Sequence, residues 1–172
     1  ETSISLYKDT HFSVFSILGT VETASLILLI SLLIFSNLRK ITVLILYVTI
    51  GLIEVAGKLI IEQKGPPIEF LKTNLHLGFP SGVISGDFFS YPSGHSARTA
   101  FISAVLLFAI WLNPKIKKEL RIFLVFCILI FDFLMFVSRV YLGEHWTSDV
   151  VGGLLLGLSL AALASFFVIK RT

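Results

Sequence analysis

The sequence contains little charge and almost no cysteine. Only 15% of its 172 residues are charged, whereas 55% are hydrophobic, and the mean hydropathy is +0.91. Soluble domains carry about 25% charged residues, so this scarcity excludes an ordinary soluble protein and predicts a single membrane-embedded domain over residues 1–172. The one cysteine, Cys127, lies within an apolar run and excludes an intrachain disulfide.

Five apolar runs are long enough, or nearly so, to cross the hydrocarbon core of a bilayer, which takes about 20 helical residues. The runs are too long for strands and do not alternate between polar and apolar residues. We expect spans at residues 12–36, 41–61, 95–112, 120–141 and 148–169. The predicted fold class is therefore all-α, a polytopic bundle of transmembrane helices.

Basic residues are concentrated after particular spans. The segments after the first, third and fifth spans hold eight of the 14 Lys and Arg residues and one of the 11 acidic residues. Because helices alternate in direction, these segments share one side, and short basic loops are cytoplasmic. The connection 62–92 and the turn 143–148 then face outward. This distribution, rather than a nucleic-acid site, accounts for the net charge of +3.

The segment 138–149 brings three kinds of reactive or binding group into twelve residues: Arg139, His145 and Asp149. His145 and Asp149 are four residues apart, so a helix that begins nearby places them on one face. A carboxylate bonded to one imidazole nitrogen leaves the other nitrogen free to attack. Arg139 offers a planar fork of donors suited to phosphate. On these residues alone, an ordinary interfacial cluster remains the alternative.

A second polar segment, Ser93-Gly94-His95, comes just before the third span. Gly94 permits close approach of the backbone, and the helix N-terminus that follows presents free N–H groups to an anion. Ser93 adds a hydroxyl donor, and His95 lies beside this anion site. A simple helix cap is the alternative interpretation.

The second span contains Glu54 and Lys58 one helical turn apart. They form either a local pair that lowers the cost of insertion or a site where Lys58 presents its ammonium to an anion. The expected topology places all of these candidate residues on the outer face. Two imidazoles among phosphate-type donors suggest phosphoryl transfer, whereas neither the histidine spacing nor the carboxylates suit a metal.

Small residues recur every four positions after Asp149: Gly153, Gly157, Ala161 and Ser165. Small side chains let helix backbones approach closely. We therefore expect this face of the fifth span to pack inside the bundle with Asp149, although an oligomer contact is the alternative.

These segments resemble the motifs of the type 2 phosphatidate phosphatase superfamily, membrane lipid phosphatases that share a core with vanadium haloperoxidases. The family shows Lys-x6-Arg-Pro, then Pro-Ser-Gly-His, then Ser-Arg-x5-His-x3-Asp. The second motif is intact at 92–95 and the third at 138–149. The first runs from Lys58 to Pro66, with Gly65 where the family has Arg. The resemblance covers roughly residues 50 to 165.

The resemblance implies a role for each residue. His145 is expected to be a nucleophile that forms a phosphohistidine, with Asp149 orienting it and His95 acting as the general acid. Phosphate contacts are expected from Lys58, Ser93, Gly94, Arg139 and, in place of the missing Arg, Lys64. No metal or other cofactor is implied. The family's six helices, set against five spans here, predict a further helix before Glu1.

The expected function is removal of phosphate from a membrane lipid phosphate or diphosphate at the extracytoplasmic face of the plasma membrane. Candidate substrates are phosphatidate, phosphatidylglycerophosphate and polyprenyl diphosphates such as undecaprenyl diphosphate. One alternative is a phosphotransferase of the same fold, which passes the phosphoryl group to another acceptor. The other is a catalytically inactive lipid-binding protein, which the loss of Arg at Gly65 would fit. The expected partners are the lipid substrate and the bilayer, and no particular oligomer is predicted.

Overall fold

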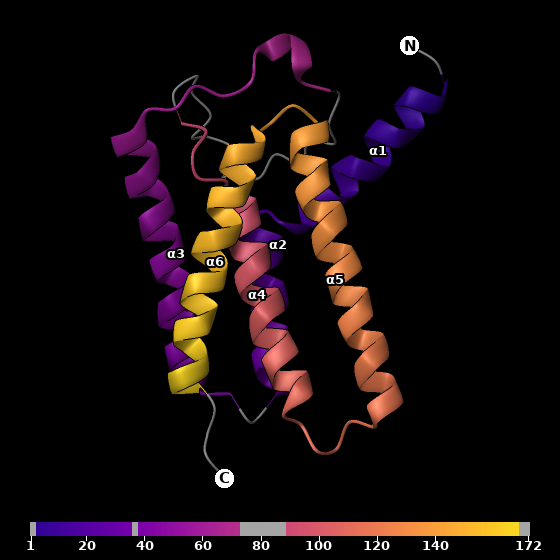
Figure 1. The fold of residues 1–172 in the computed structure, drawn as a ribbon, viewed down its shortest axis with the longest axis vertical. Coiled ribbons are helices and arrows are strands. Elements are labelled where there is room, and N and C mark those ends of the chain that lie inside the picture. The colour runs from indigo at the N-terminus through magenta and orange to yellow at the C-terminus, as the bar shows by residue number, and fades with distance from the viewer. Residues whose placement is uncertain (1–2, 36–37, 73–88, 169–172) are drawn as a thin grey trace.

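A computed structural model describes residues 3–35, 38–72 and 89–168 of the chain, which form six α-helices and a short 3-10 helix (Figure 1). The elements are α1 (Ser3–Leu18), α2 (Val21–Ile34), α3 (Lys40–Ile61), η1 (Ile68–Phe70), α4 (Gly94–Trp111), α5 (Lys118–Tyr141) and α6 (Thr147–Val168). The predicted all-α class is confirmed.

Four predicted spans are confirmed as α3, α4, α5 and α6, each long and apolar enough to cross a membrane. Helix α4 begins at Gly94 because the hydroxyl of Ser93 accepts a hydrogen bond from the backbone N–H of Ser96 at 3.5 Å. Such an N-terminal cap satisfies one of the free N–H groups in the first turn. The cap therefore fixes where the helix that follows the Ser93-Gly94-His95 segment starts.

The predicted span at 12–36 is not a single helix but a pair of helices joined at a bend. The chain breaks at Gly19-Thr20, and the segments Asp9–Leu18 and Val21–Ile34 meet at an angle of 56°. Thr20 caps α2, since its hydroxyl accepts from the N–H of Thr23 at 3.5 Å. Apolar composition continues across this break, so hydropathy alone does not reveal it. Counted as one bent span, α1 and α2 bring the number of spans to five.

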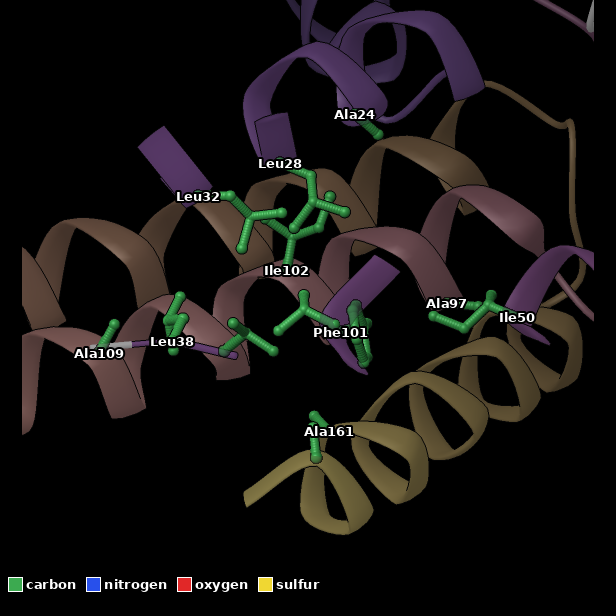
Figure 2. Close-up of a cluster of buried hydrophobic side chains, with 13 residues drawn as sticks. Ala24, Leu28, Leu32, Leu38, Ile50, Ala97, Phe101, Ile102, Ala109 and Ala161 are labelled. Carbon is green, nitrogen blue, oxygen red and sulfur yellow. The ribbon is translucent and has the colours of Figure 1, made fainter. Parts of the chain in front are cut away.

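Helix α4 lies at the centre of the bundle, with α6 and α5 on either side of it in Figure 1 and α2 behind. Most of its residues are buried, whereas α5 buries only Met135, Ser138 and Arg139. The core around α4 includes Phe101 and Ile102, which pack with side chains of α2 and α3 (Figure 2). Because lipid is as apolar as the core, such packing holds the helices together through close van der Waals contact.

The small residues of α6 face α4, as predicted. A Cβ atom added at Gly157 would lie 2.8 Å from the Cβ of Ala100, and one at Gly153 would lie 3.0 Å from the Cβ of Ser96. Ala161, one turn further along, is buried. The close approach of α6 to α4 brings the beginnings of these two helices side by side.

Figure 1 shows the beginnings of α3 and α5 at one end of the bundle, and the beginnings of α4 and α6 at the other. The basic residues at 39–40 and 115–121 therefore lie at the end opposite Ser93 and His145. We call the end that carries these two residues the His145 end.

Candidate active site

The two intact motifs meet at the His145 end of the bundle. His145 lies in the turn between α5 and α6, and Asp149 lies in the first turn of α6. The backbone N–H of Ser93 donates to the backbone carbonyl of Asp149 at 3.0 Å. Asp149 and Ser93 are fully buried, and His145 is 9% exposed. The beginning of α4 and the beginning of α6 are thus joined directly, as a shared site requires.

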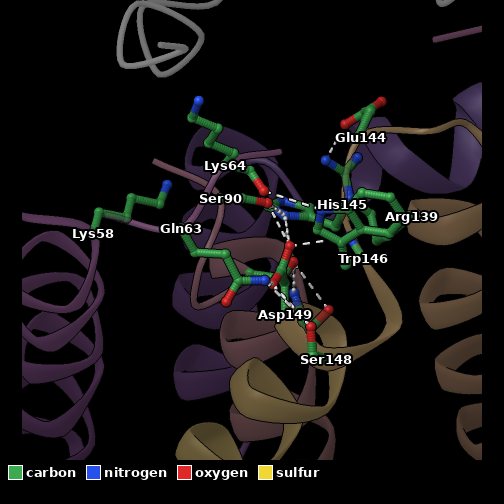
Figure 3. A network of polar contacts seen from close by, with 12 residues as sticks. Lys58, Gln63, Lys64, Ser90, Arg139, Glu144, His145, Trp146, Ser148 and Asp149 are labelled. Atoms are coloured by element: carbon green, nitrogen blue, oxygen red, sulfur yellow. Dashed lines mark hydrogen bonds and ion pairs between the residues drawn. The ribbon is translucent and has the colours of Figure 1, made fainter. Parts of the chain in front are cut away.

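The carboxylate of Asp149 faces the imidazole of His145. Its Oδ2 atom lies 3.5 Å from Nδ1 of His145, and the same oxygen accepts from the backbone N–H of Trp146 at 3.0 Å (Figure 3). Because Nδ1 points toward Asp149, the other ring nitrogen, Nε2, is the one left to react. The prediction that Asp149 points into the bundle is confirmed.

Two further side chains hold Asp149, and sequence reasoning missed both. Gln63 Nε2 donates to Asp149 Oδ1 at 2.7 Å, and the hydroxyl of Ser90 donates to Oδ2. Both belong to the long connection between α3 and α4, where no periodicity marks a functional position. Their nearness to two of the motifs, Gln63 within the incomplete motif at 58–66 and Ser90 just before the intact motif at 92–95, was the only available signal.

The environment of His145 keeps its imidazole neutral near pH 7. Burial is the largest effect and lowers the pKa of His145 below its usual value of 6.5, and the positive charge of Arg139 acts in the same direction. Asp149 opposes both by stabilising the protonated ring. A neutral imidazole has a free electron pair on Nε2, which a nucleophile needs.

Arg139 is buried near the end of α5 and fixes the turn that carries His145. Its backbone carbonyl accepts from the N–H groups of Glu144 and His145, both at 3.2 Å. Its guanidinium donates to the hydroxyl of Ser16 in α1 and pairs with the carboxylate of Glu144. Neither Ser16 nor Glu144 was predicted, because residue spacing along the chain does not show which side chains approach an arginine.

His95 and Gly94 occupy the first turn of α4. The imidazole of His95 is partly buried, and the charges of Arg139 and Lys58 are near enough to act on it. Gly94 is needed for close packing, since a Cβ at this position would overlap the carboxylate of Glu54. The structure therefore brings His95 into the same electrostatic environment as His145 and the candidate phosphate ligands.

Lys58 is half-buried and belongs to a triad of charges with the buried residues Glu54 and Arg98. Its ammonium donates to Glu54 Oε1 at 2.9 Å, and Arg98 Nη1 donates to Glu54 Oε2 at 2.6 Å. The local pair of Glu54 and Lys58 is thus present, and Arg98 from α4 completes it. Sequence reasoning missed Arg98, although an arginine inside an apolar span was a usable signal.

Lys64 takes part in the site through its backbone. Its carbonyl accepts from Nε1 of Trp146 at 3.0 Å. In Figure 3 the side chains of Lys58 and Lys64 lie to one side of the network around Asp149. At Gly65, where the family has Arg, an added Cβ would approach Ser90 Oγ only to 3.8 Å, so a side chain fits there.

A cavity of about 320 Å³ lies beside His145. Its lining includes Pro66, Phe70, Lys72 and Trp146. Lys72 lies with its ammonium 3.2 Å from the centre of the Tyr141 ring, which also lines the cavity. The cavity gives a small polar group room beside the imidazole. In the described part of the chain, no three His, Cys, Asp or Glu side chains come together as metal ligands.

Comparison with known proteins identifies relatives of the chain and structures that share its fold. Phosphatidylglycerophosphatase B of Bacillus subtilis (strain 168) is 37% identical over 83 residues, which is 48% of this chain but only 38% of that relative. A crystal structure of the first transmembrane PAP2 type phosphatidylglycerolphosphate phosphatase from Bacillus subtilis shares the fold, with a TM-score of 0.71 and 23% identity over 97% of this chain and 87% of that one. The crystal structure of Aquifex aeolicus LpxE has a TM-score of 0.66 and 23% identity, covering 93% and 86% of the two chains.

The family assignment rests on the sequence itself as well as the fold. The model of the PAP2 superfamily matches residues 40–172, a segment that contains α3 to α6 and both intact motifs. This is well over half of the chain, and it includes His95, His145 and Asp149. The chain is therefore a multi-pass membrane protein of the PAP2 superfamily.

Proposed function

We propose that the chain is a metal-independent phosphatase that removes phosphate from a membrane lipid phosphate or diphosphate. The observation that carries the proposal is the position of His145: its Nδ1 faces the buried Asp149 carboxylate at 3.5 Å, and α4 begins directly beside them. A nucleophile oriented by a carboxylate next to a helix N-terminus suits phosphoryl transfer.

In the first step, the phosphate lies at the N-terminus of α4, with its oxygens near the positive charges of the site. The proposed ligands are Lys58, Lys64, Ser93, Gly94 and Arg139. His145 Nε2 attacks phosphorus while the bond from phosphorus to the lipid oxygen breaks. His95 gives a proton to the departing oxygen. Asp149 stabilises the positive charge that forms on the imidazole of His145.

In the second step, water attacks phosphorus and the bond from phosphorus to nitrogen breaks. His95, which has lost its proton, now accepts one from the water. Inorganic phosphate leaves, and His145 returns to its neutral form. The cations stabilise the phosphoryl oxygens in both steps, since their charge is fixed in place before the reaction begins.

The relatives named phosphatidylglycerophosphatase make phosphatidylglycerophosphate the first substrate to test. Phosphatidate and undecaprenyl diphosphate belong in the same panel, because all three present a terminal phosphate on a hydrocarbon anchor. Activity that persists in the presence of a chelator is expected, and full inhibition that added metal reverses would contradict the proposed chemistry.

The decisive experiment replaces the nucleophile. His145→Ala should lower phosphate release by roughly 10³-fold or more and abolish covalent labelling by a radioactive lipid phosphate, while the protein still folds. Phosphate release that depends on an added alcohol acceptor would favour a phosphotransferase. A wild-type protein that binds the lipid without releasing phosphate would favour an inactive lipid-binding protein.

We further propose that the His145 end faces outward at the plasma membrane, because the short basic segments lie at the opposite end. In a Cys127→Ser background, the variants Lys72→Cys and Lys117→Cys should react with an impermeant thiol reagent from opposite sides, Lys72→Cys from outside. Reaction of both from one side of intact cells would contradict this orientation.

A further inference from the structure

A second cavity, of about 240 Å³, lies inside the membrane-spanning part of the bundle. It is bounded by α2, α4 and α5, and its lining is almost entirely apolar, with Ile27, Ile102, Leu106 and Phe131 among its residues. Two residues of the lining, Thr99 and Ser103, carry hydroxyls, and the hydroxyl of Ser103 donates to Asp132 Oδ1 at 2.6 Å. The cavity is therefore suited to hydrocarbon rather than to a polar ligand.

The cavity begins directly beneath His95. Its lining includes Thr99, one helical turn after His95 on α4, and Leu18, the residue before Gly19. A Cβ at Gly19 would lie only 3.1 Å from Cδ2 of His95. The elbow between α1 and α2 therefore lies against the imidazole and the cavity at the same time.

From His95 the cavity continues along one face of α4. Thr99, Ile102, Ser103 and Leu106 are four, seven, eight and eleven residues after His95, so all five lie on one face of the helix. At about 1.5 Å of rise per residue, Leu106 is about 16 Å from His95 along the helix axis. This depth is close to half of the ~30 Å hydrocarbon core.

The cavity also reaches the lipid-facing surface of α5. Cys127 is exposed on that surface and lines the cavity. The cavity thus extends from the neighbourhood of the proposed general acid to the side of the bundle, and a chain can enter it from the bilayer without crossing water.

We propose that this cavity holds the hydrocarbon chain of the lipid substrate during the reaction. The inference rests on the proposed function, because a general acid must lie within hydrogen-bond reach of the oxygen that it protonates. In an alkyl phosphate the leaving oxygen is bonded directly to the hydrocarbon chain, and in phosphatidate one glycerol lies between them. For such substrates His95 fixes where the hydrophobic part begins, and the apolar space next to His95 continues along α4 in the direction of the membrane centre.

The first test fills the cavity from its lipid-facing side. Cys127→Trp should lower kcat/KM for hexadecyl phosphate at least about tenfold relative to butyl phosphate, the effect of removing the contacts of about two methylenes. Phe126→Trp is the matched control, because Phe126 is the neighbouring residue on α5 and is 61% exposed away from the cavity. It should leave the ratio for the two substrates unchanged.

An equal effect of Cys127→Trp on both substrates, or no effect on either, would overturn the inference. Failure of the proposed function is recognised separately, as an absence of phosphate release from both substrates by the wild-type protein, and it would overturn the inference as well.

The second test does not use turnover and relies on Cys127, the only cysteine of the chain. In His145→Ala protein, hexadecyl phosphate should slow the reaction of Cys127 with a maleimide several-fold more than hexadecanol does at the same concentration. Equal protection by the two compounds would mean that any bilayer lipid fills the cavity, and it would overturn the assignment to the substrate chain.

Discussion

Asp149 and Glu54 are two buried carboxylates near the same end of the bundle, and they are stabilised in different ways. Asp149 receives hydrogen bonds from neutral donors: the amide of Gln63, the hydroxyl of Ser90 and the backbone N–H of Trp146. Glu54 pairs with two cations, Lys58 and Arg98. One carboxylate therefore keeps its negative charge, whereas the other belongs to a triad with a net positive charge.

This difference separates two tasks of the proposed site. The negative charge of Asp149 is available to stabilise the imidazolium that forms on His145, because neutral donors orient a carboxylate without cancelling its charge. The triad around Glu54 leaves a positive charge where a phosphate would bind, next to Gly94. Removing the charge of Asp149 should therefore change catalysis, whereas disrupting the charge pairs of Glu54 should change mainly stability.

Asp149→Asn should have the largest effect and should act on catalysis. The neutral amide cannot stabilise the imidazolium, and we expect kcat to fall about 10⁴-fold, comparable to the loss caused by such a substitution in other carboxylate–histidine pairs. Thermal unfolding in detergent checks that the protein is intact. A kcat close to that of the wild type would contradict the role given to Asp149.

The same variant also predicts the direction in which the pH dependence of the reaction should shift. The acid limb of kcat/KM in the wild type should have its midpoint below pH 6.5, because burial lowers the pKa of His145 and only the neutral ring attacks. Asp149 raises that pKa, so its removal should move the midpoint to still lower pH. A shift to higher pH would contradict the assignment.

Arg98→Met should act mainly on stability. The substitution leaves the buried carboxylate of Glu54 with one cation instead of two, and breaking a buried ion pair costs about 3–5 kcal/mol. We expect a loss near the lower end of that range, since Lys58 stays in place, measured by reversible unfolding in detergent.

The control for this prediction is the double variant Glu54→Gln/Arg98→Met, which removes the buried charges together. It should recover most of the stability, because an unpaired buried charge is costly and a neutral replacement is not. A double variant no more stable than Arg98→Met alone would show that Arg98 stabilises the bundle through packing.

Lys64→Ala should have the smallest effect and tests the cationic side of the comparison. We expect Lys64 to replace the phosphate contact that Arg would make at position 65. Its loss should then reduce the stabilisation of the transition state, measured through kcat/KM, by about 1.5–3 kcal/mol, the range for a hydrogen bond to a charged group. Gly65→Arg in the Lys64→Ala background should restore much of the activity, since a Cβ at Gly65 meets no closer atom than Ser90 Oγ at 3.8 Å. A silent Lys64→Ala would leave this position without a phosphate contact.

Several features could be predicted because they depend on local chemistry. The apolar runs of α3 to α6 gave spans close to those observed, and the four-residue spacing of His145 and Asp149 placed them together at the start of α6. The small residues of α6 likewise predicted its close packing against α4. Helical periodicity and side-chain size are properties of short segments, so the order of residues was sufficient.

The bend between α1 and α2 and the partners of the site residues came only from the tertiary structure. Gln63 and Ser90 reach Asp149 from 86 and 59 residues away along the chain, and Ser16 reaches Arg139 from 123 residues away. Arg98 of α4 donates a hydrogen bond to Glu54 of α3. Contacts of this kind depend on how the helices pack, and no local pattern specifies which polar group will satisfy a buried charge. The sequence by itself therefore determined the spans α3 to α6, the motifs and the family, whereas packing decided the bend between α1 and α2, the partners of each buried charge and the position of the cavity beneath His95.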